Sequence, residues 1–218
     1  MNYRKGYLMI AATLCLTISL SSCGGNKDKK DKDANPPVIF RKDTATHKKT
    51  DVAVAKDAPI INISDTVSLK ANIIYIKDSA STSIRLSQKL ALIYGTKLGA
   101  VIKQNKLKMV GPPMAWYRTQ KAPFFFEAGL PVDKKPSKLP KNVLFKTIAG
   151  GDSVLIAHFY GPYDQTSIAY EALNDWLKDR KQKLRAPAYE VYVTDPIDKA
   201  GKPVDPYKVQ TDIVFPRN

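Results

Sequence analysis

The feature that most constrains the fold is an arrangement of secondary structure that is predicted twice along the chain. Residues 83–104 and 165–183 each carry apolar side chains at intervals of three and four, which places them on one face of an α-helix. These positions are Leu86, Leu90, Ile93, Leu98, Val101 and Ile102 in the first segment, and Ile168, Ala169, Ala172, Leu173, Trp176 and Leu177 in the second. Each predicted helix follows one predicted strand and precedes two others, so the chain reads as two strand-helix-strand-strand repeats.

The predicted strands place both repeats in one domain, residues 60–218. They lie at 72–77, 108–118 and 123–130 in repeat one (60–132) and at 153–160, 188–194 and 208–215 in repeat two (143–218). Asp164 is positioned to cap the second helix. Two such repeats, related by a pseudo-twofold axis, predict an α+β domain whose helices cover one face of a sheet. We expect a ligand cleft on the other face.

The N-terminus has the order of a secretory signal. Arg4 and Lys5 precede an apolar run over 7–20, and two small serines follow it. A membrane-spanning helix needs about 20 apolar residues, whereas this run is shorter and is interrupted by threonine and serine. We therefore interpret residues 1–22 as a removable signal peptide, with an uncleaved membrane anchor as the alternative.

Residues 20–23, Leu-Ser-Ser-Cys, resemble the bacterial lipobox. In that motif the signal peptidase cuts before a cysteine that carries a thioether-linked diacylglycerol, and palmitate is an acyl group of such anchors. The resemblance implies that Cys23 is the lipidated first residue of a lipoprotein in the cell envelope, held on a bacterial membrane; a plain signal peptide is the alternative. Cleavage would remove Cys15, so the mature chain would have no pair of cysteines for a disulfide.

Residues 23–59 read as a tether between the lipid and the domain. They are rich in Lys, Asp, Thr and Ala and contain few large apolar side chains, so we expect them to be disordered. The mixed charges at 27–33 should keep this segment extended and hydrated.

The chain is strongly basic. It has 35 Lys and Arg against 20 Asp and Glu, a formal net charge of +15. Such an excess favours acidic surfaces, but the lysines are scattered along the sequence, and the predicted export makes nucleic acid an unexpected partner. We interpret the charge as a solvated surface, with a polyanion site as the alternative.

A strand with a carboxylate beside aromatic residues is the strongest candidate for a binding site. In Tyr-Glu-Val-Tyr-Val-Thr at 189–194, side chains alternate between the two faces, so Glu190 and Tyr192 share one face and Tyr189 and Val191 the other. A buried carboxylate is costly unless its charge is compensated, and a ligand cation is one candidate. A satisfied or edge-exposed glutamate on a half-buried strand is the alternative.

Further aromatic side chains are candidates for the wall of a pocket. They are Tyr160, Tyr163, Trp116, Tyr117 and Phe126. A turn-forming Gly-Pro pair separates Tyr160 from Tyr163 and would bring both near the edge of the sheet. Alternation puts Trp116 and Tyr117 on opposite faces, so at most one of them lines a given face. Ordinary core packing is the alternative for each ring.

Signatures of catalysis and of cofactor binding are scarce. His47 and His158 lie far apart with no cysteine near them, so we expect no metal site. Gly150 and Gly151 lack the Lys-Ser/Thr of a phosphate-binding loop, and no Gly-x-Ser-x-Gly sequence occurs. We therefore expect no cofactor and interpret the chain as a binding protein rather than an enzyme.

Five segments, in order, resemble a known family. They are Phe-Glu-Ala-Gly-Leu-Pro-Val at 126–132, His-Phe-Tyr-Gly-Pro-Tyr at 158–163, the helical segment 169–177, Glu-Val-Tyr with Asp-Pro at 190–196, and Thr-Asp-Ile-Val-Phe-Pro at 211–216. Together they are similar to the gyrase-inhibitory-protein-like (GyrI-like) superfamily, also called the AraC-type or bacterial transcription activator effector-binding domain. The resemblance extends over residues 107–218.

The resemblance implies two pseudo-twofold repeats with a ligand cleft between them. In drug-sensing members, a glutamate of the Glu-x-Tyr strand sits among aromatic rings and meets lipophilic cations, and Glu190 matches that position. Some stand-alone relatives are similar to hydrolases of strained electrophilic ligands that rely on a glutamate. The predicted signal and tether stand where a regulator would have its DNA-binding helices, which does not fit a transcription factor.

Three functions follow as hypotheses. The first is a membrane-tethered lipoprotein that binds a small, largely apolar or cationic ligand in an aromatic cleft. The second is a structural or protein-interaction lipoprotein whose cleft is filled by side chains, and the third is a hydrolase in which Glu190 is the general base or nucleophile. The predicted ligand-binding residues are Glu190, Tyr192, Tyr160, Tyr163, Tyr117, Trp116 and Phe126.

Overall fold

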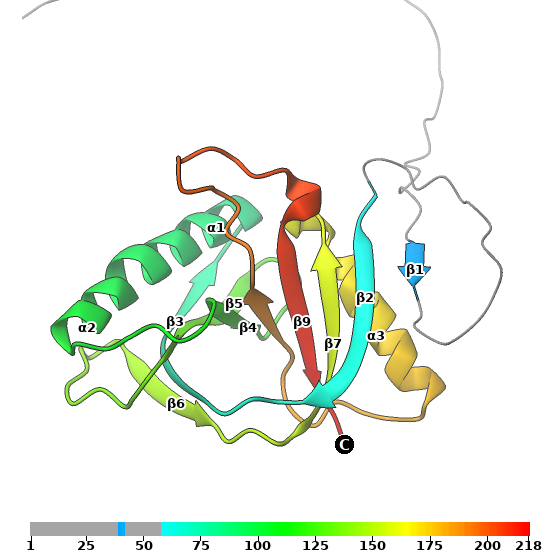
Figure 1. The fold of residues 1–218 in the computed structure, drawn as a ribbon, viewed down its shortest axis with the longest axis horizontal. Helices are drawn as coiled ribbons and strands as arrows, with labels where there is room; N and C mark the ends of the chain where they lie inside the picture. The colour runs from blue at the N-terminus through cyan, green and yellow to red at the C-terminus, as the bar shows by residue number, and fades with distance from the viewer. Residues whose placement is uncertain (1–38, 42–57) are drawn as a thin grey trace, which may run out of the picture. The chain divides into compact units, whose positions relative to one another are not determined.

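The computed structural model describes residues 39–41 and 58–218 (Figure 1). The predicted signal peptide, Cys23 and most of the predicted tether lie outside the described residues. Within the described part, no helix is both long enough and apolar enough to span a membrane.

A twisted sheet forms the frame of the described part. Its nine strands are β1 (Ile39–Arg41), β2 (Ile60–Val67), β3 (Ala71–Ala80), β4 (Met114–Tyr117), β5 (Phe124–Val132), β6 (Leu144–Ile148), β7 (Ser153–Tyr160), β8 (Tyr189–Tyr192) and β9 (Gln210–Pro216). They lie in the order β1-β2-β7-β9-β8-β4-β5-β3-β6. Every neighbouring pair is antiparallel except β1 and β2, which run parallel.

The strand order has the predicted pseudo-twofold symmetry. Strands β7-β9-β8 of repeat two mirror β3-β5-β4 of repeat one, and the two halves meet where β8 pairs with β4. The outer strands β2 and β6 cross over between halves, since β2 lies against β7 and β6 lies against β3. The predicted α+β class with two strand-helix-strand-strand repeats is confirmed.

The first helix occupies the predicted range but is not a uniform α-helix. It consists of α1 (Ser83–Ala91), the π-helical segment η1 (Leu92–Leu98) and α2 (Gly99–Gln104). The Thr82 side chain caps its start by accepting a hydrogen bond from the Arg85 N–H. The wider π turn shifts the helical register at its centre, a feature that sequence periodicity does not reveal and that often marks a functional site.

The second helix begins later than predicted. A 3₁₀ turn, η2 (Tyr163–Gln165), precedes α3 (Ser167–Asp179), and Asp164 lies inside this turn. The prediction of Asp164 as the helix cap was therefore wrong. Pro162 holds an extended backbone directly before the turn, so the chain begins to coil at Tyr163 and Asp164 is already in the turn.

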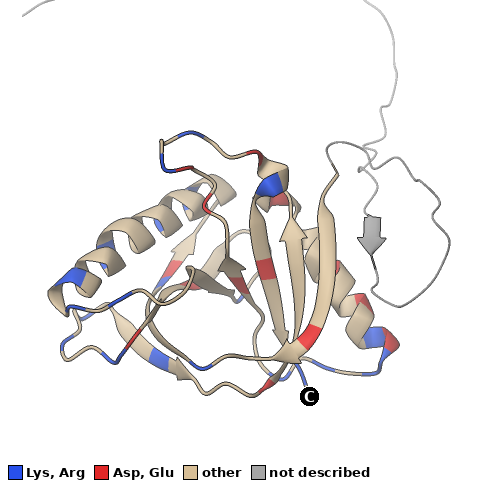
Figure 2. Cartoon of the chain, viewed as in Figure 1, with Lys and Arg blue, Asp and Glu red and all other residues tan. Residues whose placement is uncertain are grey.

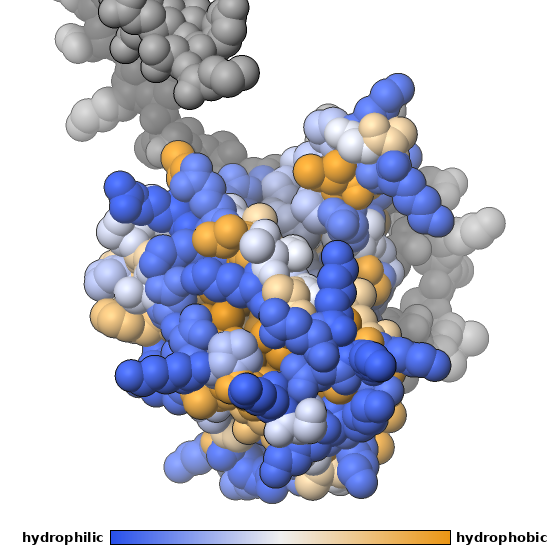
Figure 3. All heavy atoms as spheres, turned by 90° about the vertical axis from the view of Figure 1, so that its left-hand side faces the viewer, coloured by the Kyte–Doolittle hydropathy of each residue, from blue (hydrophilic) through white to orange (hydrophobic). Residues whose placement is uncertain are grey.

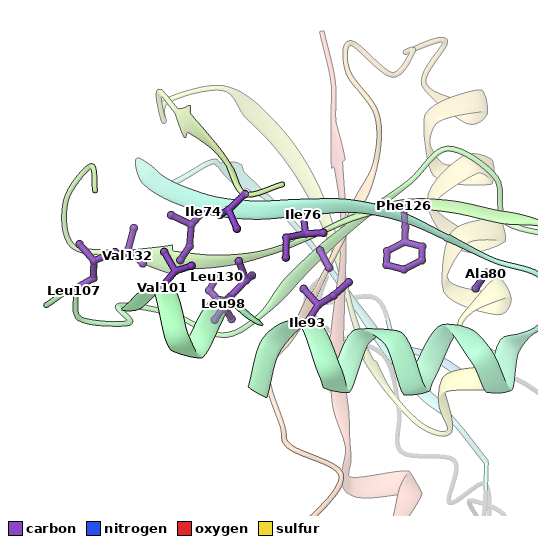
Figure 4. Packing of buried hydrophobic residues seen from close by; sticks show 12 residues of the cluster. Ile74, Ile76, Ala80, Ile93, Leu98, Val101, Leu107, Phe126, Leu130 and Val132 are labelled. Atoms are coloured by element: carbon purple, nitrogen blue, oxygen red, sulfur yellow. The ribbon is translucent and has the colours of Figure 1, made fainter. Parts of the chain in front are cut away.

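Both helices pack on the same face of the sheet. Helix α1–α2 covers the first core cluster, in which Ile93, Leu98 and Val101 lie close to Ile74 and Ile76 (Figure 4). Helix α3 covers a second cluster formed with β7 and β9. We call this the helix face. The opposite face, which we call the open face, carries a smaller cluster around Ile73, Met114, Val154, Tyr189 and Val214.

Three strands were not predicted, and the predicted strand 108–118 was much too long. Strands β2 and β6 were missed, and β1 lies within the segment 23–59 that we expected to be disordered. The predicted strand 108–118 shrinks to β4, because two prolines at 112–113 lack the N–H that a central strand donates.

The charged side chains are dispersed. Figure 2 shows Lys and Arg spread over both helices and the loops, and the side seen in Figure 3 is largely hydrophilic with separate apolar patches. This distribution fits the solvated surface expected from the sequence better than a single polyanion site.

Candidate functional site

Glu190 lies at the seam between the two repeats. One row of cross-strand neighbours runs over the sheet through Ile76, Ala128, Ala115, Glu190, Ile213 and Ala157. The first two belong to the core under α1–α2 and the last two to the core under α3. Glu190 therefore points to the helix face, between the two helices, and not to the open face where we expected the ligand cleft.

The Glu190 carboxyl group is buried, and no basic side chain among the described residues pairs with it. Its residue is 7% exposed, and the Tyr170 hydroxyl donates a hydrogen bond to its Oε1 at 3.1 Å. None of the ion pairs among the described residues includes Glu190. Burial raises the pKa of Glu190 to about 7, against the opposing effect of hydrogen bonds from Tyr192 and Tyr170. The group is thus poised between its neutral and charged forms near neutral pH.

Five tyrosines surround this carboxyl group, and we call them the tyrosine cluster. They are Tyr94 of η1, Tyr117 of β4, Tyr163 of η2, Tyr170 of α3 and Tyr192 of β8. The hydroxyl oxygens of Tyr117 and Tyr192 lie 2.7 Å apart, so one donates to the other. The Tyr192 ring also meets the edges of Tyr94 and Tyr163, with centroid distances of 6.2 and 5.8 Å. Elements from both repeats therefore meet around one carboxylate.

The carboxylate and the tyrosines influence each other electrostatically. Burial, together with the nearby Glu190 charge, raises the pKa of Tyr117, Tyr170 and Tyr192. For Tyr163, burial and the charges of Asp195 and Glu190 raise the pKa to about 12. The hydroxyls therefore stay protonated at neutral pH and act as hydrogen-bond donors. The cluster offers neutral donors and ring faces but no positive charge.

Four predicted site residues are brought together and three are not. Glu190 lies with Tyr192, Tyr163 and Tyr117. Phe126 is next to Tyr117, with ring centroids 6.2 Å apart, but is part of the core under α1–α2.

Trp116 and Tyr160 lie on the open face. The Trp116 ring packs against Tyr189 with a centroid distance of 5.4 Å, and the Tyr160 hydroxyl donates to Gln210 Oε1 at 3.0 Å. The alternation of side chains along β4 and β7 separates both residues from Glu190.

Two members of the tyrosine cluster were not predicted as site residues. Tyr170 lies within the apolar stripe of α3, where it is indistinguishable from a core residue by spacing alone. Tyr94 lies in the π-helical segment η1, and its hydroxyl donates to the Met114 carbonyl oxygen at 2.9 Å. The only sequence signal for Tyr94 was its position directly after Ile93, which belongs to the predicted apolar face of the first helix.

A cavity of about 370 Å³ lies on the open face, and Glu190 does not line it. Its lining includes Trp116, Tyr189, Lys146, Glu127 and Arg185. The Lys146 ammonium lies 3.2 Å from the Trp116 ring centroid and 3.0 Å from Glu127 Oε2. An internal cation thus already covers the aromatic surface there. No group of three or more potential metal ligands occurs among the described side chains.

Comparison with solved structures shows which fold this is. The C-terminal domain of EcmrR matches with a TM-score of 0.61 and 16% identity over 72% of this chain and 98% of that domain. The part of this chain that the structure describes therefore shares the fold of the EcmrR domain, which is the GyrI-like fold. EcmrR in the structure of the EcmrR-DNA complex in EcmrR-RPo matches with a TM-score of 0.60 and 19% identity, over 72% of this chain but only 57% of that chain.

An uncharacterized conserved protein from Listeria innocua also has this fold, with a TM-score of 0.52 and 11% identity over 72% of this chain and 92% of that protein. No protein-family model and no curated protein matches the chain by sequence.

Proposed function

We propose that the domain binds a small, largely apolar cation beside Glu190. One observation carries this proposal: Glu190, a residue that is 7% exposed, lies among five tyrosines, and no described basic side chain pairs with its carboxyl group. An ionised carboxylate in such a place is unstable unless a positive charge joins it. A ligand cation supplies that charge.

The tyrosine cluster suits the apolar part of such a ligand. Aromatic ring faces attract cations, and each contact contributes roughly 0.5–2 kcal/mol. Tyr163, which is 40% exposed, lies at the outer side of the cluster and marks the side from which a ligand enters. We expect a bound ligand to replace the hydroxyl contact between Tyr117 and Tyr192 with contacts of its own.

Two other functions have support from the same contacts. The packed tyrosine rings also suit a structural lipoprotein whose cleft is filled by its own side chains. A carboxyl pKa of about 7 also suits a general base, as a hydrolase would require. The binding function accounts better for an acid without a cationic partner, because a filled cleft gains nothing from a buried carboxyl group.

A titration with tetraphenylphosphonium, a lipophilic cation with four phenyl rings, tests the proposal. We expect it to raise the melting temperature of the full-length protein, whereas tetraphenylborate, an anion of nearly the same shape, has no effect. Glu190→Gln should abolish the response. The matched control is Glu127→Gln, which alters a carboxyl group on the open face and should leave the response intact.

Other outcomes of ligand titrations would support the filled cleft or the hydrolase instead. A folded protein that responds to neither ion, nor to neutral aromatic compounds, has a filled cleft. Product formed from a bound ester or epoxide, and lost in Glu190→Gln, indicates a hydrolase.

We also propose that Cys23 anchors the protein to the membrane of the cell envelope. The support is the Leu-Ser-Ser-Cys sequence at 20–23 after a charged and apolar leader. Cell fractionation should find the protein with the membranes, and Cys23→Ser should release it or leave the leader uncleaved. Mass spectrometry of the wild-type protein that finds no lipid-sized mass increase on the N-terminal peptide would contradict the proposed lipid anchor at Cys23.

A further inference from the structure

Three polar side chains form a hydrogen-bonded line on the open face, away from Glu190. They are Ser64 of β2, His158 of β7 and Asp212 of β9, three strands that are adjacent in the sheet. Ser64 Oγ lies 3.0 Å from His158 Nε2, and His158 Nδ1 lies 2.9 Å from Asp212 Oδ1. His158 and Asp212 are direct cross-strand partners, and Ser64 is a diagonal neighbour of His158. The sheet register thus sets the geometry of the whole line.

The carboxylate determines which atom carries each proton. An ionised Asp212 only accepts hydrogen bonds, so the Nδ1 of neutral His158 must carry the hydrogen and its Nε2 must present a lone pair. Ser64 therefore donates its hydroxyl proton toward Nε2. Asp212 Oδ1 also accepts from Gln210 Nε2 at 2.8 Å, and Gln210 Oε1 accepts from the Tyr160 hydroxyl. These two contacts orient the carboxylate that orients the imidazole.

We propose that Ser64, His158 and Asp212 form a nucleophilic site that hydrolyses small activated esters. Nucleophile, base and orienting carboxylate stand in the order and at the distances that this chemistry uses on unrelated folds. Ser64 is the nucleophile, His158 is the general base, and Asp212 is the positioning residue.

The reaction balances with water as the co-reactant. Ser64 Oγ attacks the ester carbonyl carbon, an Oγ–C bond forms, and the hydroxyl proton moves to His158 Nε2. The bond to the leaving alcohol breaks, and the alcohol takes that proton. Water then attacks the acyl group while His158 Nε2 accepts a proton from it, and the proton returns to Ser64 Oγ as the acid departs. Ester and water become acid and alcohol.

All three side chains are partly exposed. The side chains of His158 and Asp212 are 30% and 17% exposed, and Ser64 is half-buried, on the face that neither helix covers. Strand β1 pairs with β2 only at Ile60–Asn62, so no described strand adjoins the outer edge of β2 beside Ser64.

A fluorophosphonate probe, which phosphonylates nucleophilic serines with loss of fluoride, tests this site in the full-length protein. We expect peptide mass spectrometry to find the adduct on Ser64, and none in Ser64→Ala. His158→Gln should slow labelling about 100-fold, the usual contribution of a general base. Ser137→Ala, which changes an exposed serine elsewhere, is the matched control and should label normally. Turnover of p-nitrophenyl acetate should follow the same order.

Two results would overturn the proposal. One is a folded wild-type protein in which Ser64 stays unlabelled, and the other is labelling at Ser64 that His158→Gln leaves unchanged. The test is independent of cation binding, since Glu190 lies on the other face of the sheet: Glu190→Gln should leave labelling intact, and Ser64→Ala should leave the tetraphenylphosphonium response intact.

Discussion

Replacing Glu190 with glutamine should stabilise the folded protein at neutral and alkaline pH. Burial raises the carboxyl pKa to about 7 from an ordinary value of 4.5, so the native state binds this proton more tightly than the unfolded chain does. The native state therefore loses stability as the pH rises from 4.5 towards 7 and the carboxyl group becomes ionised. Glutamine resembles the neutral acid in shape and can still accept a hydrogen bond from Tyr170.

The size of the effect follows from the pKa. Each pKa unit corresponds to 1.36 kcal/mol, so ionisation of Glu190 destabilises the native state by about 3 kcal/mol once the pH exceeds 7. A change of 1 kcal/mol shifts the melting temperature of a domain of this size by about 2–4 °C. We expect Glu190→Gln to melt about 6–12 °C above wild type at pH 8, and at nearly the wild-type temperature at pH 4.

Thermal unfolding over this pH range provides the measurement, and Glu127→Gln is the matched control. Burial raises the pKa of Glu127, but its hydrogen bonds and charge interactions with Lys146 and Lys77 outweigh this and hold the pKa below its usual range. Removing that charge should therefore destabilise the protein, with the loss greatest at neutral pH. A Glu190→Gln protein that is less stable than wild type at pH 8, or whose advantage does not change with pH, would refute the reasoning.

Two further predictions concern other parts of the sheet. Gly129→Ala should destabilise the fold by about 1–3 kcal/mol in chemical denaturation, because the added Cβ would lie 2.6 Å from Ile73 Cγ2; Gly95→Ala, with no atom within 4 Å, is the control and should cause no such loss. The hydrogen bond to Asp212 raises the pKa of His158, so this pair adds stability below pH 6.5 that disappears as the pH rises through the raised pKa. His158→Gln should remove this dependence, and an unchanged pH profile of unfolding would show that the pair has no such role.

Much of the fold was predictable because its signals are local. The apolar spacing in 83–104 indicates a helix whatever that helix packs against. The predicted limits of this helix coincide with Ser83 and Gln104. The same holds for β7, whose limits were predicted from a short β-branched and aromatic run. Strands β2 and β6 were missed because they bury few side chains, only Ile61 in β2 and none in β6, so neither carries a clear apolar pattern.

The surroundings of Glu190 depend on tertiary packing, which local sequence patterns do not reveal. Alternation correctly separated Trp116 from Tyr117 and joined Glu190 with Tyr192 on one face, because that rule depends only on the strand itself. It could not say which face the helices cover, since this depends on how α1–α2 and α3 pack. We therefore expected Glu190 in a cleft on the open face, whereas it is buried on the helix face between the two helices.

The sequence by itself determined the α+β class, the repeat, and the shared strand face of Glu190 and Tyr192, because periodicity and alternation are properties of short segments. Only the tertiary structure decided that Tyr94 and Tyr170 join Glu190, and that Ser64 meets His158 across 94 positions of sequence. These groups come from separate strands and helices. Their distances depend on strand order and register, which are set by the burial of two cores and not by any one segment.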